Sequence, residues 1–94
     1  MIIQWLEDAI YDLQSLRQYI AEDNPKAANR VAEKIINSVN LLSEQPGVGR
    51  LGRVHGTREL VVSDTPYIIP YRVRKNIVEV LRVLHSAMQW PEEL

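Results

Sequence analysis

Three short runs in the second half of the chain are rich in β-branched, aliphatic and aromatic residues. They cover residues 57–62, 67–73 and 77–85, and each is bounded by turn residues, as strands commonly are. The segments between them, residues 63–66 and 74–76, are short enough to join neighbouring antiparallel strands. The pattern therefore predicts a three-stranded antiparallel meander.

The first half of the chain has a helical period instead. From Leu6 onward, apolar residues recur every three or four positions among acidic and polar ones, which is the pattern of an amphipathic helix. We expect this helix to end near Ala21. Asn24 and Pro25 then supply a cap and a first helical residue for a second helix, which should end before Pro46. The two apolar stripes are Ala9, Leu13, Leu16 and Ile20, then Ala28, Val31, Ile35, Val39 and Leu42.

These elements together predict an α+β fold. Two helices joined by a link of about four residues form an antiparallel hairpin, and its apolar side must be buried against another layer. The meander is the partner available, and the short apolar run Ile2–Trp5 is a candidate first strand beside it. We expect one domain, residues 1–94, with the order β-α-α-β-β-β and the helical hairpin packed on a small antiparallel sheet.

The segment from Pro46 to Gly56 holds all four glycines of the chain. Gly47 to Gly52 superficially fits a phosphate-binding loop, but that motif needs a strand before it, a helix after it, and Lys-Ser/Thr at its end. Here the segment follows a helix and leads into a strand. We therefore expect a mobile connection with positive-φ positions.

Alternation along the last run sorts its side chains between two faces. Val78, Val80, Arg82 and Leu84 fall toward the helices, and Ile77, Glu79, Leu81, Val83 and His85 fall away from them. We therefore expect His85 on the exposed face. Arg82 should snorkel to an edge or pair with an acid such as Glu59 or Asp12. Trp90, in the C-terminal tail, should fold back as partial cover for the core, or else contact another protein.

Composition narrows the kinds of site that the chain can hold. An apolar share of 46% supports a packed core. The chain has no cysteine and two histidines far apart, so neither a disulfide nor a zinc site is expected, and no metal or cofactor is assigned.

No apolar run approaches the roughly 20 residues of a membrane span. The first residues also lack the basic and long apolar regions of a secretory signal. We therefore expect a cytoplasmic protein that makes no membrane contact.

The net charge of −1 is unevenly distributed. Residues 1–45 carry four basic and seven acidic groups, or −3, whereas residues 46–94 carry seven basic and five acidic groups, or +2. From Pro46 to Arg58 there is no acid. This segment is either a local basic surface for an acidic partner or a flexible, solvated loop. A total this close to zero argues against strong, non-specific affinity for nucleic acid.

One catalytic scheme fits the residue types. Cleavage of RNA through its 2′-hydroxyl needs a base, an acid and a cation for the developing phosphate charge. Glu59 or His85 has the chemistry to move protons, and Arg58 or Arg72 has the chemistry to hold a phosphate. The sequence alone does not show that these four side chains converge.

The ordered set of motifs resembles the RelE/ParE superfamily of toxins from bacterial type II toxin–antitoxin modules. The resemblance extends over nearly the whole chain and implies the fold predicted above, together with neutralisation by a cognate antitoxin. The motifs that carry it are Ala9, Asp12-Leu13, Tyr19-Ile20, Asn24-Pro25, Ala27-Ala28, Pro46, Gly49-Arg50, Gly56 to Leu60, Tyr67 to Ile69, Tyr71 to Val73, Val80, Arg82 to His85 and Trp90-Pro91.

Within this superfamily, RelE-like and YoeB-like members cut messenger RNA in the ribosomal A site, whereas ParE-like members block DNA gyrase. The ribonucleases carry an arginine three residues before the tyrosine matched by Tyr71, where this chain has Ile68. A later arginine and tyrosine of RelE-like members fall at Ser86 and Glu92. His85 matches the YoeB-like histidine, although ParE-like members share the Val-Leu-His ending. The resemblance thus favours a ParE-like gyrase inhibitor, which acts by binding rather than as an enzyme.

A ParE-like toxin implies growth inhibition and plasmid stabilisation, with an antitoxin laying an amphipathic helix and a strand along the toxin. One alternative is a ribosome-dependent mRNA endoribonuclease using Arg58, Glu59, Arg72 and His85, and a second is an inactive module that only binds its antitoxin. A homodimer or a toxin–antitoxin hetero-oligomer is compatible with each. The candidate antitoxin- or target-binding residues are Arg50, Arg53, Arg58, Arg72, Arg74, Arg82, His85 and Trp90.

Overall fold

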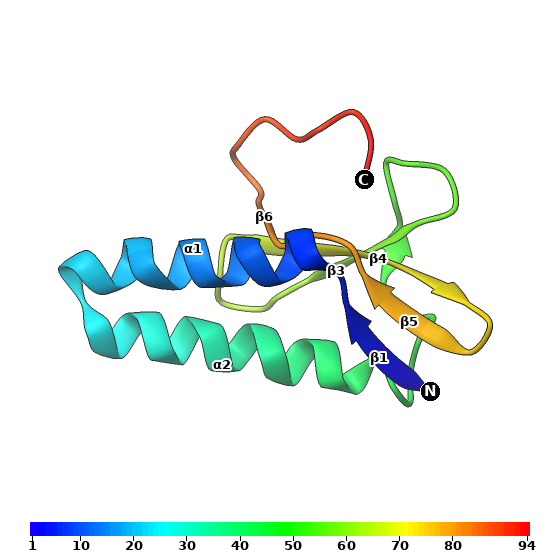
Figure 1. Cartoon of the computed structure of the whole chain (residues 1–94), viewed down its shortest axis with the longest axis horizontal. Coiled ribbons are helices and arrows are strands. Elements are labelled where there is room, and N and C mark those ends of the chain that lie inside the picture. Colours follow the sequence, from blue (N-terminus) through cyan, green and yellow to red (C-terminus); the bar gives the residue numbers. More distant parts are fainter.

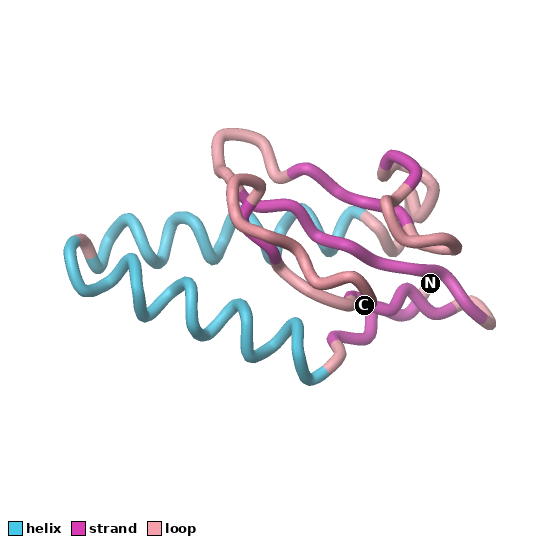
Figure 2. Tube along the Cα trace, turned by 90° about the horizontal axis from the view of Figure 1, so that it is seen from above, coloured by secondary structure: helices cyan, strands magenta, loops and turns pink.

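Two antiparallel helices lie side by side against one face of a mixed β-sheet in the computed structural model, which describes residues 1–94 (Figure 1). The linked ends of the helices extend beyond the sheet, as both Figure 1 and Figure 2 show. This arrangement confirms the predicted α+β class. The elements are β1 (Ile2–Trp5), α1 (Glu7–Asp23), α2 (Pro25–Leu41), β2 (Arg50–Leu51), β3 (Arg58–Val61), β4 (Tyr67–Arg74), β5 (Ile77–Val80) and β6 (Leu84–His85).

A single residue, Asn24, joins the two helices. Its side-chain Oδ1 accepts a hydrogen bond from the Ala27 N–H at 3.1 Å, as predicted for a helix cap, and Pro25 occupies the first helical position of α2. The prediction that α1 ends near Ala21 is wrong by two residues, and so is the expected four-residue link. Asn24 also donates its N–H to the Ile20 carbonyl at 2.9 Å. One extended residue therefore ends one helix and caps the next.

The sheet has the strand order β1-β5-β4-β3-β2, with β6 also paired to β4. The β3, β4 and β5 strands form the predicted antiparallel meander. β1 joins it as predicted, but it runs parallel to β5, with Ile2 opposite Ile77 and Trp5 opposite Val80. The sheet is therefore mixed rather than antiparallel. The long connection that a parallel pair requires consists here of both helices together with β2, β3 and β4.

The core lies between the helices and the sheet. It combines the two predicted helical stripes with the helix-facing side chains of β4 and β5. Burial of this apolar surface provides the main stabilisation of such a fold. The fully buried side chains include Ile35, Val39, Leu42, Val62, Ile69, Tyr71, Val78 and Val80.

The last predicted strand is interrupted after β5. Val80 opposes Tyr71, whereas Leu84 opposes Ile68. Two residues of β4 lie between these pairs, but three residues, 81–83, lie between them on the other side. One extra residue on one strand of an antiparallel pair is a β-bulge. The single run predicted from Ile77 to His85 is therefore two strands, β5 and β6, separated by a bulge.

The bulge reverses the alternation of the residues that follow it, because one extra residue exchanges the two faces of a strand. Val83 joins the helix-facing core, and His85 lies opposite Tyr67, another core residue. The predicted placement of Val83 and His85 away from the helices is wrong, and so is that of Leu84 toward them. Val78 and Val80, which precede the bulge, face the core as predicted.

The glycine-rich segment is more regular than predicted, since it contains β2. Only Gly56, at φ 81°, has a positive φ among the four glycines. Gly49 is instead required by close approach, because a Cβ there would lie 2.6 Å from the Tyr71 hydroxyl oxygen. Gly52 approaches Thr57 even more closely. The predicted positive-φ positions therefore reduce to Gly56 alone, and the segment contains a short strand that was not predicted. Elsewhere in the chain, neither helix has the length and apolar character needed to cross a bilayer.

Candidate binding groove

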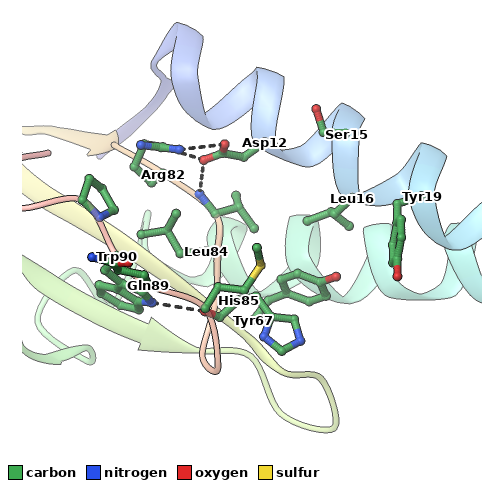
Figure 3. A pocket seen from close by; sticks show the side chains of 13 residues that line it. Asp12, Ser15, Leu16, Tyr19, Tyr67, Arg82, Leu84, His85, Gln89 and Trp90 are labelled. Carbon is green, nitrogen blue, oxygen red and sulfur yellow. Dashed lines mark hydrogen bonds and ion pairs between the residues drawn. The ribbon is translucent and has the colours of Figure 1, made fainter.

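An open groove of about 940 Å³ lies between α1, the β4–β6 end of the sheet and the C-terminal tail (Figure 3). Seven of its 13 lining residues are hydrophobic. A large, mostly apolar concavity with a few polar groups is the usual form of a binding site in a protein. The lining residues are Asp12, Ser15, Leu16, Tyr19, Tyr67, Arg82, Val83, Leu84, His85, Met88, Gln89, Trp90 and Pro91.

Asp12 and Arg82 form a two-pronged ion pair at one side of the groove (Figure 3). The Arg82 Nε donates to Asp12 Oδ2 at 2.7 Å, and Nη2 donates to Oδ1 at 3.0 Å. This pairing confirms one of the two partners predicted for Arg82. The hydrogen bonds to Asp12 raise the pKa of Arg82, although partial burial opposes the shift. Since Arg82 is committed to Asp12, its charge is not free for a ligand.

His85 lines the groove and uses one of its two ring nitrogens in a hydrogen bond to the chain. Its Nδ1 accepts a hydrogen bond from the Ala87 N–H at 3.1 Å, so in the neutral ring the hydrogen is on Nε2. The ring meets that of Tyr67 edge-on, with 5.5 Å between centroids. No side chain of the protein pairs with Nε2, and His85 therefore offers a hydrogen-bond donor to an incoming group.

Trp90 binds the C-terminal tail to β6 at one end of the groove. Its Nε1–H donates to the His85 carbonyl at 3.2 Å (Figure 3). The Arg53 guanidinium lies 3.7 Å from the centre of its ring, a cation–π contact. Trp90 is half-buried and folds back toward β6, but it is not among the side chains that pack on the core, so the predicted cover of the core is wrong. The aromatic face of Trp90 is covered by an arginine from the glycine-rich segment.

Glu59 balances much of the charge of that segment. Its carboxylate is only 3% exposed, and it accepts hydrogen bonds from Arg50 Nε at 3.1 Å and from the Arg53 backbone N–H at 2.9 Å. The predicted basic surface therefore includes a buried acid supplied by β3. The Arg58 guanidinium does not pair with Glu59. Its Nη1 donates to the Gly49 carbonyl at 2.8 Å.

Arg72 and Arg74 share Glu79 on the sheet face opposite the helices. The Nε atoms of the two arginines lie 2.6 Å and 3.1 Å from Glu79 Oε1. The hydrogen bond from Arg72 is the main reason why the pKa of Glu79 is lowered. Both arginines keep some exposed N–H groups, but neither lines the groove.

The four candidate nuclease residues do not converge. Glu59 and Arg72 each have an ion-pair partner on the sheet face away from the helices. Arg58 and His85 lie toward the helices, but they oppose β4 residues four positions apart, a separation of about 13 Å along a strand. No two of these residues form a hydrogen bond with each other, so the arrangement does not contain an assembled acid–base pair with a phosphate-binding cation.

Sequence reasoning found three groove residues, Arg82, His85 and Trp90, and missed most of the others. The clearest omission is Tyr19, which is 73% exposed on α1. A large aromatic side chain among the polar positions of an amphipathic helix was the available signal, since such positions normally carry charged or small polar groups. Tyr67 and Met88 gave no comparable signal, because the first resembles a core residue and the second lies in an irregular tail.

Residues 3–90 match the family model of the ParE toxin of type II toxin–antitoxin systems, parDE. The chain belongs to the ParE toxin family. This ParE toxin is 47% identical over 92 residues to "Putative toxin Y4kP" of Sinorhizobium fredii, covering 98% of this chain and 95% of that protein. It is 38% identical over 85 residues to "Toxin RelE2" of Caulobacter vibrioides, covering 90% and 94% respectively.

The fold of this ParE toxin matches that of a chain from the chromosomal ParDE toxin–antitoxin system of P. aeruginosa. The TM-score is 0.81 at 27% sequence identity, and the match covers 90% of this chain and 95% of that one. The predicted membership of the RelE/ParE superfamily and the predicted packing of a helical hairpin on a sheet are both confirmed.

We expect the free energy of unfolding of this ParE toxin to fall as the pH rises above about 10. Burial raises the pKa of Tyr67 and Tyr71 above their ordinary value of 10.0. Below that value both the folded and the unfolded chain keep these protons, so the pH has no effect through them. Above it, the unfolded chain loses protons that the folded chain retains, which favours unfolding.

Urea unfolding between pH 8 and pH 11 measures this effect. The variant carrying both Tyr67→Phe and Tyr71→Phe should show a shallower decline than the wild type. An equally steep decline in the two proteins would assign the alkaline sensitivity to other groups.

Proposed function

We propose that this ParE toxin inhibits growth by binding DNA gyrase and holding it on cleaved DNA, and that a cognate antitoxin neutralises it by filling the groove. ParE-like members of the superfamily act on gyrase, and the chain belongs to the ParE family. In this proposal the toxin works as a binding protein. Its potency depends on the lifetime of a complex rather than on a chemical step.

The separation of the four candidate nuclease residues carries this proposal. A general acid or base must lie within hydrogen-bonding reach of the proton that it moves, and a phosphate-binding cation must lie beside it. Here Glu59 and Arg72 are held in ion pairs on one face, and His85 lies on the other. Ile68, at the position where the ribonucleases have an arginine, is buried opposite Leu84. These observations favour recognition over catalysis.

The groove is suited to a segment of an antitoxin. Its apolar lining would receive the apolar side of an amphipathic helix, which is a common way for a protein to recognise a peptide. The matching chain from P. aeruginosa comes from a ParDE toxin–antitoxin system. Exposed Tyr19 and Met88 at the groove provide large side chains that a partner would cover.

A gyrase assay tests the proposal. Purified toxin is incubated with gyrase, ATP and relaxed plasmid, and the products are separated after treatment with detergent and protease. We expect supercoiling to fall and linear DNA to accumulate, and we expect prior addition of the cognate antitoxin to prevent both effects. Unchanged supercoiling with toxin in large excess over gyrase would remove gyrase as the target.

The alternative is a ribosome-dependent mRNA endoribonuclease. It is favoured by His85, which lines the open groove and has no protein partner at Nε2, and relatives of this chain carry the names "Toxin RelE2" and "Toxin RelE3". Under this alternative, a reporter message on translating ribosomes would be cut, and the cutting would be lost in His85→Ala. Uncut message at the toxin concentrations that inhibit gyrase would exclude it.

A further inference from the structure

The bulge between β5 and β6 has a specific construction. Leu81 donates its N–H to the Pro70 carbonyl at 2.9 Å, and Leu84 opposes Ile68. Arg82 and Val83 therefore both stand opposite the single residue of β4 that lies between these pairs, and both side chains are directed toward α1: Arg82 reaches Asp12, and Val83 joins the core.

A bulge leaves an extra residue without its place in the hydrogen-bond ladder. Here Val83 is that residue. Its N–H donates to Asp12 Oδ2 at 3.0 Å, and the same carboxylate accepts the two hydrogen bonds from Arg82 (Figure 3). Asp12 thus binds both residues of the bulge from the middle of α1, 70 and 71 positions away in sequence.

The bulge decides which face of the sheet His85 occupies. Without the extra residue, His85 would continue the alternation of Ile77 and Glu79, on the face away from the helices. With it, His85 lies opposite Tyr67 and lines the groove. Bulges beside functional sites commonly re-aim a side chain in this way.

The two ring nitrogens of His85 have different hydrogen-bonding roles. The Ala87 N–H occupies Nδ1, which leaves Nε2–H as a donor. Leu16 and Met88 are among the apolar residues that line the same groove. A hydrogen-bond donor in apolar surroundings discriminates strongly, because a partner without an acceptor would leave it buried and unpaired.

We propose that Asp12 is the positioning residue of this groove and that His85 is its specificity-determining donor. The His85 Nε2–H donates to an acceptor oxygen, carried beside a large apolar side chain, on the antitoxin segment that fills the groove. Asp12 acts indirectly by holding the bulge that places His85 there. This inference rests on the proposed function in one respect, namely that an antitoxin segment occupies the groove.

Two substitutions of similar polarity test the donor. The amide nitrogen of glutamine can take the place of imidazole Nε2, whereas that of asparagine lies near Nδ1. We expect His85→Gln to bind the cognate antitoxin within about threefold of the wild type, and His85→Asn and His85→Ala to bind about tenfold more weakly, the effect of one lost hydrogen bond. Calorimetric titration of the purified proteins measures these affinities, and equal affinity for all three variants would overturn the donor role.

Asp12 requires a readout that a purely structural residue would not change. In Asp12→Asn we expect the nuclear Overhauser contact between the His85 and Tyr67 rings to disappear, and the Val83 amide to exchange with solvent at least tenfold faster. Glu22→Gln is the matched control, since Glu22 is an exposed acid on the same helix with no ion-pair or hydrogen-bond partner. A retained ring contact in Asp12→Asn would overturn the positioning role.

A double-mutant cycle tests whether Asp12 affects binding through His85. If Asp12 acts through His85, the affinity of the double variant Asp12→Asn/His85→Ala should be no lower than that of His85→Ala alone. Additive losses would show that Asp12 acts by another route. If Asp12→Asn does not fold, slow exchange of the Val83 amide in the wild type is still expected, and rapid exchange there would contradict the arrangement.

The failure of this inference is separable from that of the proposed function. If wild-type toxin binds its antitoxin and inhibits gyrase while every His85 variant binds normally, only the donor role is lost. If the wild-type proteins do not associate, both the inference and the proposed neutralisation are wrong.

Discussion

Gly49→Ala is expected to lower the free energy of unfolding by about 3 kcal/mol, at the upper end of the usual cost of overpacking. A Cβ at Gly49 would lie 2.6 Å from the Tyr71 hydroxyl oxygen, 2.7 Å from Tyr71 Cε1 and 3.0 Å from the Glu59 carbonyl oxygen. Tyr71 is fully buried and Glu59 contributes backbone, so neither neighbour moves easily. The added methyl group must therefore displace the chain that leads into β2.

The displacement also breaks hydrogen bonds. The Gly49 N–H donates to the Tyr71 hydroxyl at 2.9 Å, and that hydroxyl donates to the Pro46 carbonyl at 2.8 Å. Tyr71 thus ties the end of the helical region to the sheet, and a shift at Gly49 leaves a buried hydroxyl without one partner.

Gly47→Ala is the matched control for this prediction. Gly47 lies two residues away, has no positive φ, and has no heavy atom within 4 Å of an added Cβ. Its replacement should change the stability by less than about 0.5 kcal/mol, as is usual at unconstrained surface positions. Chemical unfolding followed by circular dichroism measures both variants. Similar stabilities for Gly49→Ala and Gly47→Ala would contradict the proposed close packing of Tyr71 against the glycine-rich segment.

Tyr19→Ala is expected to weaken the complex with the cognate antitoxin by about 30-fold, or about 2 kcal/mol, which is the threshold for a hot-spot residue. Tyr19 is 73% exposed and lines the groove. A partner that fills the groove would cover its ring, and tyrosine is among the residues that contribute most at interfaces. The stability of the free toxin should change little, because the ring is mostly hydrated there.

Tyr11→Ala separates a groove effect from a general loss of aromatic surface. Tyr11 lies on the same helix and is 70% exposed, but it does not line the groove. We expect the affinity of Tyr11→Ala for the antitoxin to stay within about twofold of the wild type, since a segment that fills the groove would leave the Tyr11 ring uncovered. Equal losses for Tyr11→Ala and Tyr19→Ala would place the antitoxin elsewhere on the toxin.

The elements of this fold were largely predictable because local patterns determine them. Asn24 and Pro25 mark the start of α2 through capping chemistry that depends on neighbouring residues alone. The meander follows from short apolar runs and short turns. The end of α1 was misjudged because one capping residue serves both helices. The parallel direction of β1 depends on how the hairpin returns to the sheet, which no local pattern encodes.

The groove was less predictable because one long-range contact determines its shape. The extra residue of the bulge is not visible in the sequence from Ile77 to His85, where strict alternation gives an equally acceptable pattern. The partner of the Val83 N–H that leaves the ladder is Asp12, on a distant helix. The sequence predicted a partner for Arg82 but not the consequence of that pairing for His85. The position of the histidine was therefore predicted on the wrong face.

The charged residues were also predictable only in part, because their pairing depends on long-range contacts. Their types indicated a basic surface and a nuclease, yet the partners of Arg50 and Arg72 depend on the register between strands. Glu59 is adjacent to Arg58 in sequence but pairs with Arg50 across β2 and β3. Arg72 pairs with Glu79 across β4 and β5. Sequence spacing gives the inventory of charges, and strand register decides which of them remain available.

The stoichiometry of inhibition tests the central claim, that this ParE toxin acts by binding, most directly. Increasing amounts of toxin are added to a fixed amount of gyrase in one reaction, and to a translating extract with a labelled message in another. We predict that loss of supercoiling increases until toxin and gyrase are about equimolar and then levels off, independently of incubation time, while the message stays intact. Progressive loss of the message over time at toxin far below the ribosome concentration, with supercoiling unaffected, would contradict the account.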